Sequence, residues 1–306
     1  MTPCLLRRLG WTAVTIWGVS LLTFLVVFVV PGDPVAVLAP KGASPETRQA
    51  IRRELGLDRP VLVQYASYLG RLARGDLGRS YVTGEPVAAA IARRVPPTAV
   101  LALTGWMIWL AAGTALGVTA AVAAGRWPEQ AVLGFSILGT SLPTFWVGIV
   151  LLSLFASRLP WLPAGGYGTS THLILPALTL GLSVAADYSR LVHANLLGVL
   201  GEDYVRTARA KGLDEYRVIT RHALRNALLP LATLAGADLA ALLGGVVFTE
   251  SAFAWPGLGK LAVDAVLYLD IPMIMGTVLF SAAVVVGANL VVDLLYPLLD
   301  PRIIRR

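Results

Sequence analysis

One acidic residue in the middle of a long apolar run is the side chain whose placement most suggests chemistry. Asp238 lies about half-way along the run 227–248. If the run crosses a membrane, an acid at that depth costs roughly 2.5–3.5 kcal/mol on insertion scales, so it should face the protein interior or a water-filled cavity. Two roles stay open: Asp238 lines a translocation path and contacts a cationic group of a substrate, or it makes a structural hydrogen bond between helices.

A basic segment, 198–226, is the second pattern with chemical content. Glu202 and Asp203 favour a helix amino terminus, where the helix dipole is positive. We predict a helix of about two turns over 204–211, a break at Gly212 and a second helix over 214–226. A compact basic knob of this kind suits two functions: it rests on anionic lipid headgroups, or it fits a groove on a soluble partner.

Patterns typical of enzymes and cofactor sites are missing from the sequence. The run GLGKL at 257–261 lacks the serine or threonine of a phosphate-binding loop, and Ala254 stands where its first glycine should be. Asp238 and Asp293 lie at different depths, which disfavours an aspartate-pair protease. Cys4 is the only cysteine, and the three histidines lie far apart (His172, His193 and His222). We therefore predict no catalytic residue, no metal and no cofactor in this chain.

The composition indicates the environment in which these residues work. Of the 306 residues, 56% are hydrophobic and only 14% are charged, whereas soluble domains carry roughly 25% charged residues. The mean hydropathy is +0.71. So few charges cannot cover a water-facing surface, and the chain is predicted to be a membrane protein. The meaning of the net charge of +7 then depends on how lysine and arginine are distributed between the two sides of the membrane. No nucleic-acid partner is expected.

Apolar runs long enough to cross a bilayer predict an all-α integral membrane protein. A spanning helix needs about 20 apolar residues, and period-two alternation typical of barrel strands is absent. The first run is longer than the apolar part of a signal peptide and lacks a small-residue cleavage site, so we expect a retained helix. Six transmembrane helices are predicted, over about 11–30, 95–125, 130–157, 173–197, 227–248 and 271–292.

The lysine and arginine residues of the short loops set the predicted orientation. Two precede the first run, one separates the second and third, seven lie from Arg190 in the end of the fourth run to Arg225 before the fifth, and three follow the sixth; the opposite short loops hold only Arg158 and Lys260. Positive residues accumulate on the cytoplasmic side, so both termini and segment 198–226 are predicted to be cytoplasmic. Segment 31–96 then lies outside, because loops longer than about 60 residues cross largely regardless of charge.

Helix signals divide the outer segment 31–96. Ser44, Pro45 and Glu46 are typical of a helix start, and Gly56 should end that helix. Asp58 is predicted to cap a second helix that runs to Arg74, and a third is predicted over 85–95. The segment is either a helical cap or a docking or gating element for an external partner. Segment 249–272, with Phe253 and Trp255, is predicted to be a re-entrant plug or part of an interfacial aromatic belt.

Motifs along nearly the whole chain resemble one transporter family. The run RTARAKG at 206–212, followed after nine residues by HALR at 222–225, resembles the EAA loop of ABC importer permeases, with the departures from the general pattern that the dipeptide/oligopeptide/nickel branch shares. The outer segment after the first span is similar to that of the first permease of the pair. Further resemblances are VPGDP at 30–34, LGLD at 55–58, GDLGRS at 75–80, TE at 249–250, WPGLG at 255–259 and DPR at 300–302.

The resemblance implies the subunit of a prokaryotic inner-membrane importer with six transmembrane helices, a helical extracytoplasmic segment after the first and a cytoplasmic EAA coupling loop between the fourth and fifth. The expected divisions are 1–30, 31–96 and a core at 97–306. The implied partners are a second permease, two ATPase subunits or domains that bind ATP and magnesium, an extracytoplasmic substrate-binding protein and membrane lipid. The residues implied in ATPase coupling are Tyr204, Arg206, Thr207, Ala208, Arg209, Ala210, Lys211, Gly212, His222 and Arg225.

Di- or oligopeptides are the expected substrates, and nickel or a metallophore and oligosaccharides are the alternatives within the family. A secondary transporter and an intramembrane enzyme are the alternatives from other classes. The first would show internal repeats and ion sites within its spans. The second would need ionisable residues that converge at one depth, and the sequence offers isolated ones.

Overall fold

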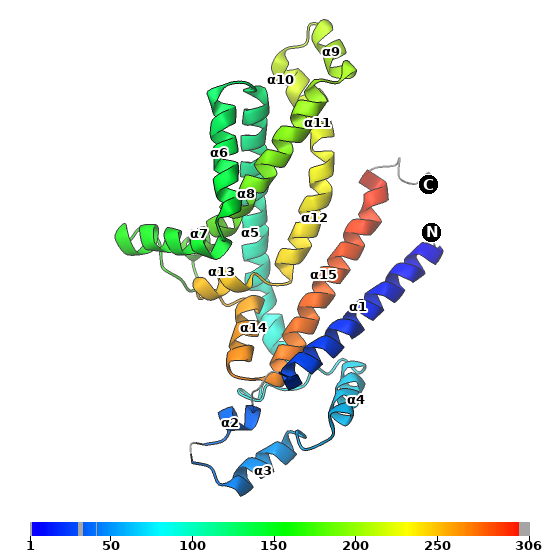
Figure 1. Cartoon of the computed structure of the whole chain (residues 1–306), viewed down its shortest axis with the longest axis vertical. Helices are drawn as coiled ribbons and strands as arrows, with labels where there is room; N and C mark the ends of the chain where they lie inside the picture. The colour runs from blue at the N-terminus through cyan, green and yellow to red at the C-terminus, as the bar shows by residue number, and fades with distance from the viewer. Residues whose placement is uncertain (1, 30–32, 41, 300–306) are drawn as a thin grey trace. The chain divides into compact units, whose positions relative to one another are not determined.

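The computed structural model describes residues 2–29, 33–40 and 42–299, and nearly all of its regular structure is helical (Figure 1). Within these residues there is no β-strand, only one isolated bridge between Arg79 and Pro86. The predicted all-α class is therefore confirmed. The motif residues 30–32 and 300–302 lie outside the described part.

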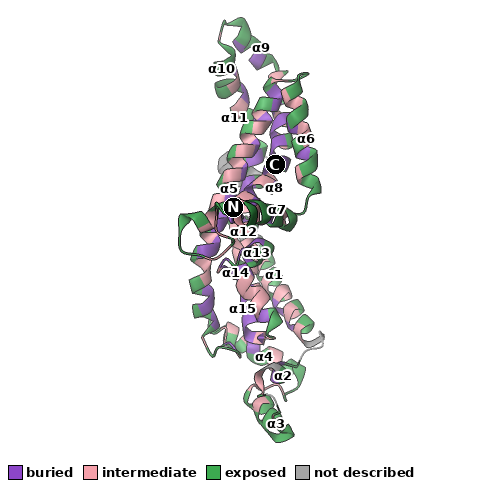
Figure 2. Cartoon of the chain, turned by 90° about the vertical axis from the view of Figure 1, so that its left-hand side faces the viewer, coloured by how far each residue is buried: buried purple, intermediate pink, exposed green. Residues whose placement is uncertain are grey.

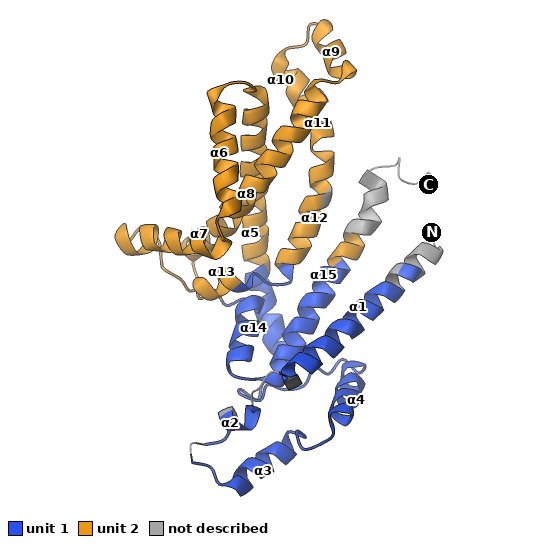
Figure 3. Ribbon diagram, in the orientation of Figure 1, with its two compact units in different colours: residues 1–98, 243–247, 256–287 blue, residues 99–242, 248–255, 288–306 orange. Residues whose placement is uncertain are grey.

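The chain divides into two compact units (Figure 3). Unit 1 comprises 1–98, 243–247 and 256–287, and unit 2 comprises 99–242, 248–255 and 288–306. The predicted outer segment therefore lies wholly in unit 1, and the basic segment 198–226 lies wholly in unit 2.

Unit 1 is built around apolar helices. They are α1, Thr2–Val29, and the first parts of α5, Val87–Val122, and α15, Ile271–Leu299. One core cluster joins Phe24 of α1 to Met275 of α15. A second joins the start of α5 to α15 and to α14, Leu258–Leu267. These clusters form the apolar base on which the outer segment rests.

The outer segment folds into three short helices, and side-chain caps begin the first two. They are α2, Pro34–Leu38, α3, Pro45–Glu54, and α4, Val61–Leu72. The Ser44 hydroxyl accepts a hydrogen bond from the Thr47 amide at 3.2 Å, and Gly56 follows α3 with φ +68°, so both predicted ends of that helix are confirmed. The cap predicted at Asp58 is wrong. A proline disfavours helical backbone in the residue before it, so Arg59 cannot sit in a first turn and α4 begins after Pro60.

A buried aspartate fixes the end of the outer segment to the start of α15. Asp270 accepts a hydrogen bond from the Ser80 hydroxyl and one from the Tyr81 amide at 3.0 Å, and it is 4% exposed. The helix predicted over 85–95 leads directly into the second predicted span. It is the beginning of the continuous 36-residue helix α5, which includes Pro96 and Pro97.

Unit 2 packs the rest of α5 against α8, Ser170–Leu200, with α6, Trp127–Ser141, and α12, Leu229–Leu243, beside them (Figure 1). A pair of glycines on α5 lies in close contact with α8. A Cβ atom on Gly113 would stand 2.6 Å from Tyr188 Cβ, and one on Gly117 would stand 2.6 Å from the Ser189 carbonyl oxygen. Small residues thus bring the two backbones together.

The predicted third span is not one straight helix. Helix α6 ends at Ser141, and the chain bends there by 103° into a second helical run, 144–158. This run consists of α7, Thr144–Leu151, and the π-helix Leu152–Arg158. Pro143 has no amide hydrogen to continue the ladder, and it holds Leu142 in extended backbone at φ −96° and ψ 126°. The 15 residues of α6 rise only about 22 Å, less than the hydrocarbon thickness.

Three described helices are long and apolar enough to span a membrane: Gly10–Val27, Val87–Val122 and Ile271–Val291. Two bent pairs, including one with a 47° bend before α12, raise the number to at most five. The fourth predicted run lies within the continuous helix α8, which carries Asp187 and Arg190. Many apolar side chains on these helices are exposed (Figure 2), as expected where lipid rather than water surrounds them; examples are Trp11, Leu22, Ile137, Leu138 and Val291.

Two of the three aromatic residues of segment 249–272 are buried, and the third, Tyr268, is 56% exposed. In unit 2, Phe253 is 1% and Trp255 is 2% exposed. Trp255 meets Tyr167 edge to face at 4.9 Å between ring centroids, and the Phe253 carbonyl accepts from the Gly166 amide at 2.9 Å. An interfacial aromatic belt is therefore wrong for these two residues, because they pack inside the unit.

Candidate functional site in segment 198–226 and at Asp238

Helix α9, Asp203–Ala210, buries one face and exposes the other. Val205 is fully buried and Ala208 is 6% exposed, and the spacing of three places both on one face of the helix. They pack with residues of the following helical run and with Leu196 of α8 in one core cluster. The opposite face carries the exposed side chains of Arg206, Thr207, Ala210 and Lys211.

A left-handed glycine and an aspartate cap turn the chain into the second helical run. Gly212 has φ +77°, a conformation that L side chains rarely adopt. Asp214 then caps α10, Glu215–Arg217, by accepting from the Arg217 amide at 3.0 Å. The run continues through the π-helix Val218–Ala223 into α11, Leu224–Ala227. The predicted helix, glycine break and second helix are confirmed; the π-helical geometry was not predicted.

Polar contacts hold the two helical parts together. Arg209 binds Glu215 through two hydrogen bonds of 2.7 and 3.1 Å. Hydrogen bonding to Arg209 lowers the pKa of the Glu215 carboxyl below its usual value, and the same bond raises the pKa of Arg209. On the other side, Asn226 donates to the Tyr204 hydroxyl at 2.8 Å. An exposed ion pair stabilises by less than about 1 kcal/mol, so these contacts fix geometry more than they drive folding.

Nine of the ten residues predicted for coupling are exposed. The exception is Ala208, which faces the core. Lys211 and Arg225 are exposed, and neither forms an ion pair within the part of the chain that is described. Sequence reasoning missed Tyr216, a 76% exposed aromatic side chain at the start of the second helical run. Its place two residues after the Asp214 cap is a signal that could have found it.

Asp238 has a hydrogen-bond partner on a neighbouring helix. The Tyr188 hydroxyl of α8 donates to Asp238 Oδ2 of α12 at 2.6 Å. Tyr188 is 5% exposed and packs against Trp109 at 6.0 Å between ring centroids. The Trp106 indole also donates to the Ala235 carbonyl at 2.8 Å. The structural role left open by the sequence is thus supported by geometry, and a role in a translocation path stays a prediction.

Two further polar pairs lie in unit 2. His193 Nε2 lies 2.9 Å from Glu129 Oε1, a contact that no sequence spacing predicted. Asp187 and Arg190, one helical turn apart, form an ion pair at 3.5 Å, with both side chains more than half exposed. Among the residues that the structure describes, no group of three histidine, cysteine or acidic side chains is placed to hold a metal ion.

Comparison with known protein families identifies the family to which the chain belongs. The model of the family described as "Binding-protein-dependent transport system inner membrane component" matches residues 113–305, and the model of its N-terminal region matches residues 1–102. The chain belongs to this family.

Similar proteins match the chain along nearly its whole length. A putative peptide transport system permease protein of Brucella suis biovar 1 is 42% identical over 311 residues, with 99% of each chain covered. The glutathione transport system permease protein GsiC of Escherichia coli strain K12 is 41% identical over 304 residues, again with 99% coverage of both. A chain of the MetNI methionine ABC transporter in an inward-facing conformation matches with a TM-score of 0.53 and 17% identity, covering 69% of this chain and 97% of that one.

The protein is therefore a permease subunit of an ABC importer, as its motifs predicted. It is a membrane component and not an enzyme, because separate ATPase subunits hydrolyse ATP in such transporters. The structural match to the methionine transporter chain, at 17% identity, supports the all-α permease fold alone.

Proposed function

We propose that this permease imports di- or oligopeptides across a prokaryotic inner membrane. The observation that carries the proposal is the identity of 41–42% to permeases named for peptide and glutathione transport, over 99% of each chain. In this proposal the chain forms the translocation path with a second homologous permease. An extracytoplasmic binding protein delivers the substrate, two ATPase subunits or domains bind ATP and magnesium, and this chain carries no cofactor of its own.

Segment 198–226 transmits the movement of the ATPases to the helices. Its shape supports this role, because two short helices clamped by the Arg209–Glu215 pair form a rigid knob. Its composition supports the role too, since Arg206, Lys211 and Arg225 are exposed. The knob also shares a core with α8, so a push on the knob reaches a long helix directly. ATP favours one transporter state only through such differential contacts.

The proposed topology has six transmembrane helices, both termini in the cytoplasm and segment 31–96 outside. Ser67 in the outer segment is exposed, and Thr207 in the knob is exposed. A cysteine at Ser67 should react with a membrane-impermeant thiol reagent in intact cells, and a cysteine at Thr207 only after permeabilisation. The reverse pattern contradicts the topology.

Asp238 is proposed to face the shared cavity, with Oδ2 bound to Tyr188. Within the described residues no hydrogen bond engages its Oδ1 atom, so the carboxylate retains the capacity to bind a second group. Gly236, Ala237 and Ala240 beside it leave room for water or another helix.

Uptake tests the substrate class. Cells that lack this permease should lose uptake of a labelled dipeptide and recover it when the wild-type chain is supplied. Labelled nickel and an oligosaccharide serve as comparison substrates and should be taken up equally with and without the chain. Unchanged dipeptide uptake together with lost nickel uptake contradicts the peptide proposal and favours the metal branch.

A further inference from the structure

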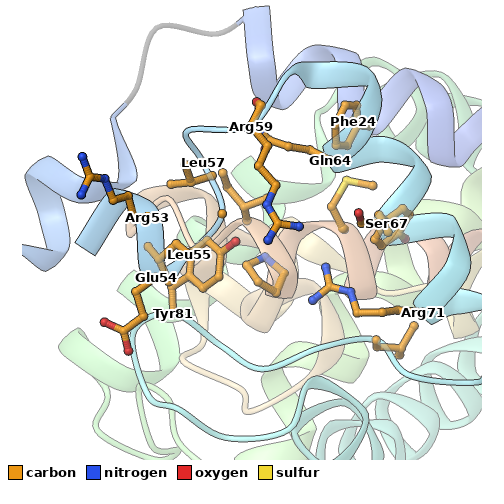
Figure 4. A pocket seen from close by; sticks show the side chains of 16 residues that line it. Phe24, Arg53, Glu54, Leu55, Leu57, Arg59, Gln64, Ser67, Arg71 and Tyr81 are labelled. Atoms are coloured by element: carbon orange, nitrogen blue, oxygen red, sulfur yellow. The ribbon is translucent and has the colours of Figure 1, made fainter. Parts of the chain in front are cut away.

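A cavity of about 360 Å³ opens in unit 1, beneath the turn between α3 and α4 (Figure 4). Its apolar part comes from Phe24 of α1 and Met275 of α15, and its polar part comes from the outer segment. The volume lies in the range of pockets that hold small organic ligands. Every lining residue belongs to the same compact unit.

The polar part of this cavity has an excess of positive charge. Arg53, Arg59 and Arg71 line it, and Glu54 is the one acidic side chain among the lining residues. In Figure 4 the guanidinium groups of Arg59 and Arg71 extend into the same space, and the carboxylate of Glu54 points away from them. Throughout 2–29, 33–40 and 42–299, no carboxylate forms an ion pair with either Arg59 or Arg71. The guanidinium groups of Arg59 and Arg71 thus line one pocket, and neither is paired with a carboxylate of the described residues.

Two tyrosines, Tyr68 and Tyr81, also line this pocket, and the hydroxyl of Tyr68 is itself covered. Tyr68 is only 7% exposed, and its buried hydroxyl lacks a hydrogen-bond partner within the described chain. Burial raises the pKa of Tyr68 to about 12 and also raises the pKa of Tyr81, while the charge of Arg71 opposes both shifts. Both hydroxyls therefore stay protonated at neutral pH. The bond from the Tyr81 amide to Asp270 fixes the backbone beside the pocket.

We propose that this cavity, the arginine pocket, binds a small organic molecule with a free carboxylate. Arg59 and Arg71 would hold the carboxylate, because a guanidinium presents two parallel donors that match its two oxygens. The tyrosine hydroxyls would donate further hydrogen bonds, and the apolar remainder of the ligand would lie against Phe24 and Met275. The apolar wall favours an organic acid over inorganic phosphate.

The carboxyl terminus of a short peptide is the member of this class that the proposed function supplies, and the choice of probe rests on that function. The experiment uses the complete transporter in lipid nanodiscs, without the binding protein, and measures the affinity of dialanine and of its carboxyl-terminal amide. Dialanine should bind saturably. The amide, which lacks the negative charge, should bind at least about tenfold more weakly, as expected when a charge-assisted pair is lost.

Substitutions locate the binding in the pocket. Arg59→Gln and Arg71→Gln should each weaken dialanine binding by about tenfold or more, and Arg71→Lys should weaken it less, because it keeps the charge and loses the fork. Arg74→Gln is the matched control, since Arg74 is exposed three residues after Arg71 and does not line the pocket. Thermal unfolding of each variant should match the wild type.

Three results overturn the proposal: no dialanine binding by the wild type at millimolar concentration, equal binding of the amide, or wild-type affinity in the Arg59 and Arg71 variants. Weaker association of the binding protein with these variants, without dialanine binding, also overturns it, because the pocket then receives an acidic side chain of a partner. Dipeptide uptake is measured separately, so failure of the pocket leaves the proposed import intact, and failure of import leaves a measured carboxylate site.

Discussion

Segment 198–226 and the outer segment 31–96 are built from the same parts and use their charges differently. Both consist of short helices separated by left-handed glycines, Gly212 at φ +77° in one and Gly75 at φ +76° in the other. In segment 198–226, three arginines pair with carboxylates of the same segment. In the outer segment, Arg52 and Arg93 pair in the same way with Asp33 and Glu85, whereas Arg59 and Arg71 converge on a pocket without such partners.

The difference shows how one residue type supports two functions. Arginines that are paired within a segment hold its shape, so the segment can act as a rigid body against a partner. Arginines left unpaired around a cavity keep their binding capacity for a ligand that arrives from outside. The comparison makes the pairing of each arginine, rather than the number of arginines, the property that separates a mechanical element from a binding site.

Substitution of the two glycines should give the largest effects and separates the two segments. Valine at either position strains the backbone by about 1–3 kcal/mol, because φ is positive at both. Gly212→Val should reduce substrate-stimulated ATP hydrolysis and uptake at least tenfold, since it distorts the surface that meets the ATPase. Gly75→Val, with similar strain, should leave ATPase stimulation nearly normal.

Gly198→Val serves as a control, because Gly198 lies within a helix and a Cβ there meets nothing within 4 Å. If Gly212→Val retains wild-type stimulation and uptake, segment 198–226 is not the coupling element. If Gly75→Val impairs stimulation as strongly as Gly212→Val, the distinction between the two segments is wrong.

Asp238 extends the comparison to a paired group between two helices of unit 2. Asp238→Leu should destabilise the protein by about 1–3 kcal/mol, because it leaves the Tyr188 hydroxyl buried without an acceptor. Asp238→Asn keeps an acceptor oxygen and should preserve assembly. The measurement is the yield and thermal stability of the purified complex, with Tyr188→Phe as the partner variant.

Uptake by the Asn variant separates the two roles of Asp238. Slower uptake of peptides with a free amino group, compared with blocked peptides, indicates a place in the path. Equal uptake of both, together with impaired assembly of Asp238→Leu, restricts Asp238 to its bond with Tyr188.

Paired and unpaired arginines should differ in their contributions to stability. Arg209→Gln removes the bidentate pair with Glu215 and should lower the unfolding free energy by about 0.3–1 kcal/mol. Arg71→Gln should cause no loss, because it breaks no ion pair and relieves repulsion from Arg59. Chemical unfolding of the two variants under identical detergent conditions gives both values, and a larger loss for Arg71→Gln contradicts the distinction.

Acid should produce the smallest effect. The pKa of Glu215 is lowered in the folded protein, so the pair with Arg209 contributes stability above the ordinary glutamate pKa of about 4.3, and this contribution is lost as pH falls through the lower folded value. Because the pair is exposed, the change should be at most about 0.5 kcal/mol. Glu215→Gln should abolish this part of the pH dependence, and an unchanged pH profile in that variant assigns it to other groups.

The sequence was sufficient to predict a helix boundary where that boundary depends only on the residues next to it. The cap at Ser44, the glycine at 56 and the break at Gly212 were all predictable, because capping and positive φ are properties of a few adjacent residues. The bend before Pro143 carried its own signal as well, but the absence of charges across 130–157 outweighed a single proline in the prediction.

Contacts across the sequence were not predictable from these patterns. The bond between Tyr188 and Asp238 joins residues fifty positions apart, and only the packing of α8 against α12 brings them together. The arginine pocket likewise needs the turn after α3 to rest on the start of α15. Periodicity and charge counts describe each helix separately, so they could identify Asp238 and the basic residues without their partners.

Cross-linking tests the central claim, that segment 198–226 carries the contact with the ATPases, most directly. A cysteine is placed at Lys211 in the knob or at Ser67 in the outer segment, with Cys4 replaced by serine, and the assembled transporter is treated with a short thiol-to-amine cross-linker. We predict that the Lys211 position joins this permease to an ATPase subunit, that ATP changes the yield, and that the Ser67 position gives no such product. Cross-linking to the ATPase from Ser67, or none from Lys211 in an assembled and ATP-hydrolysing complex, would contradict the account.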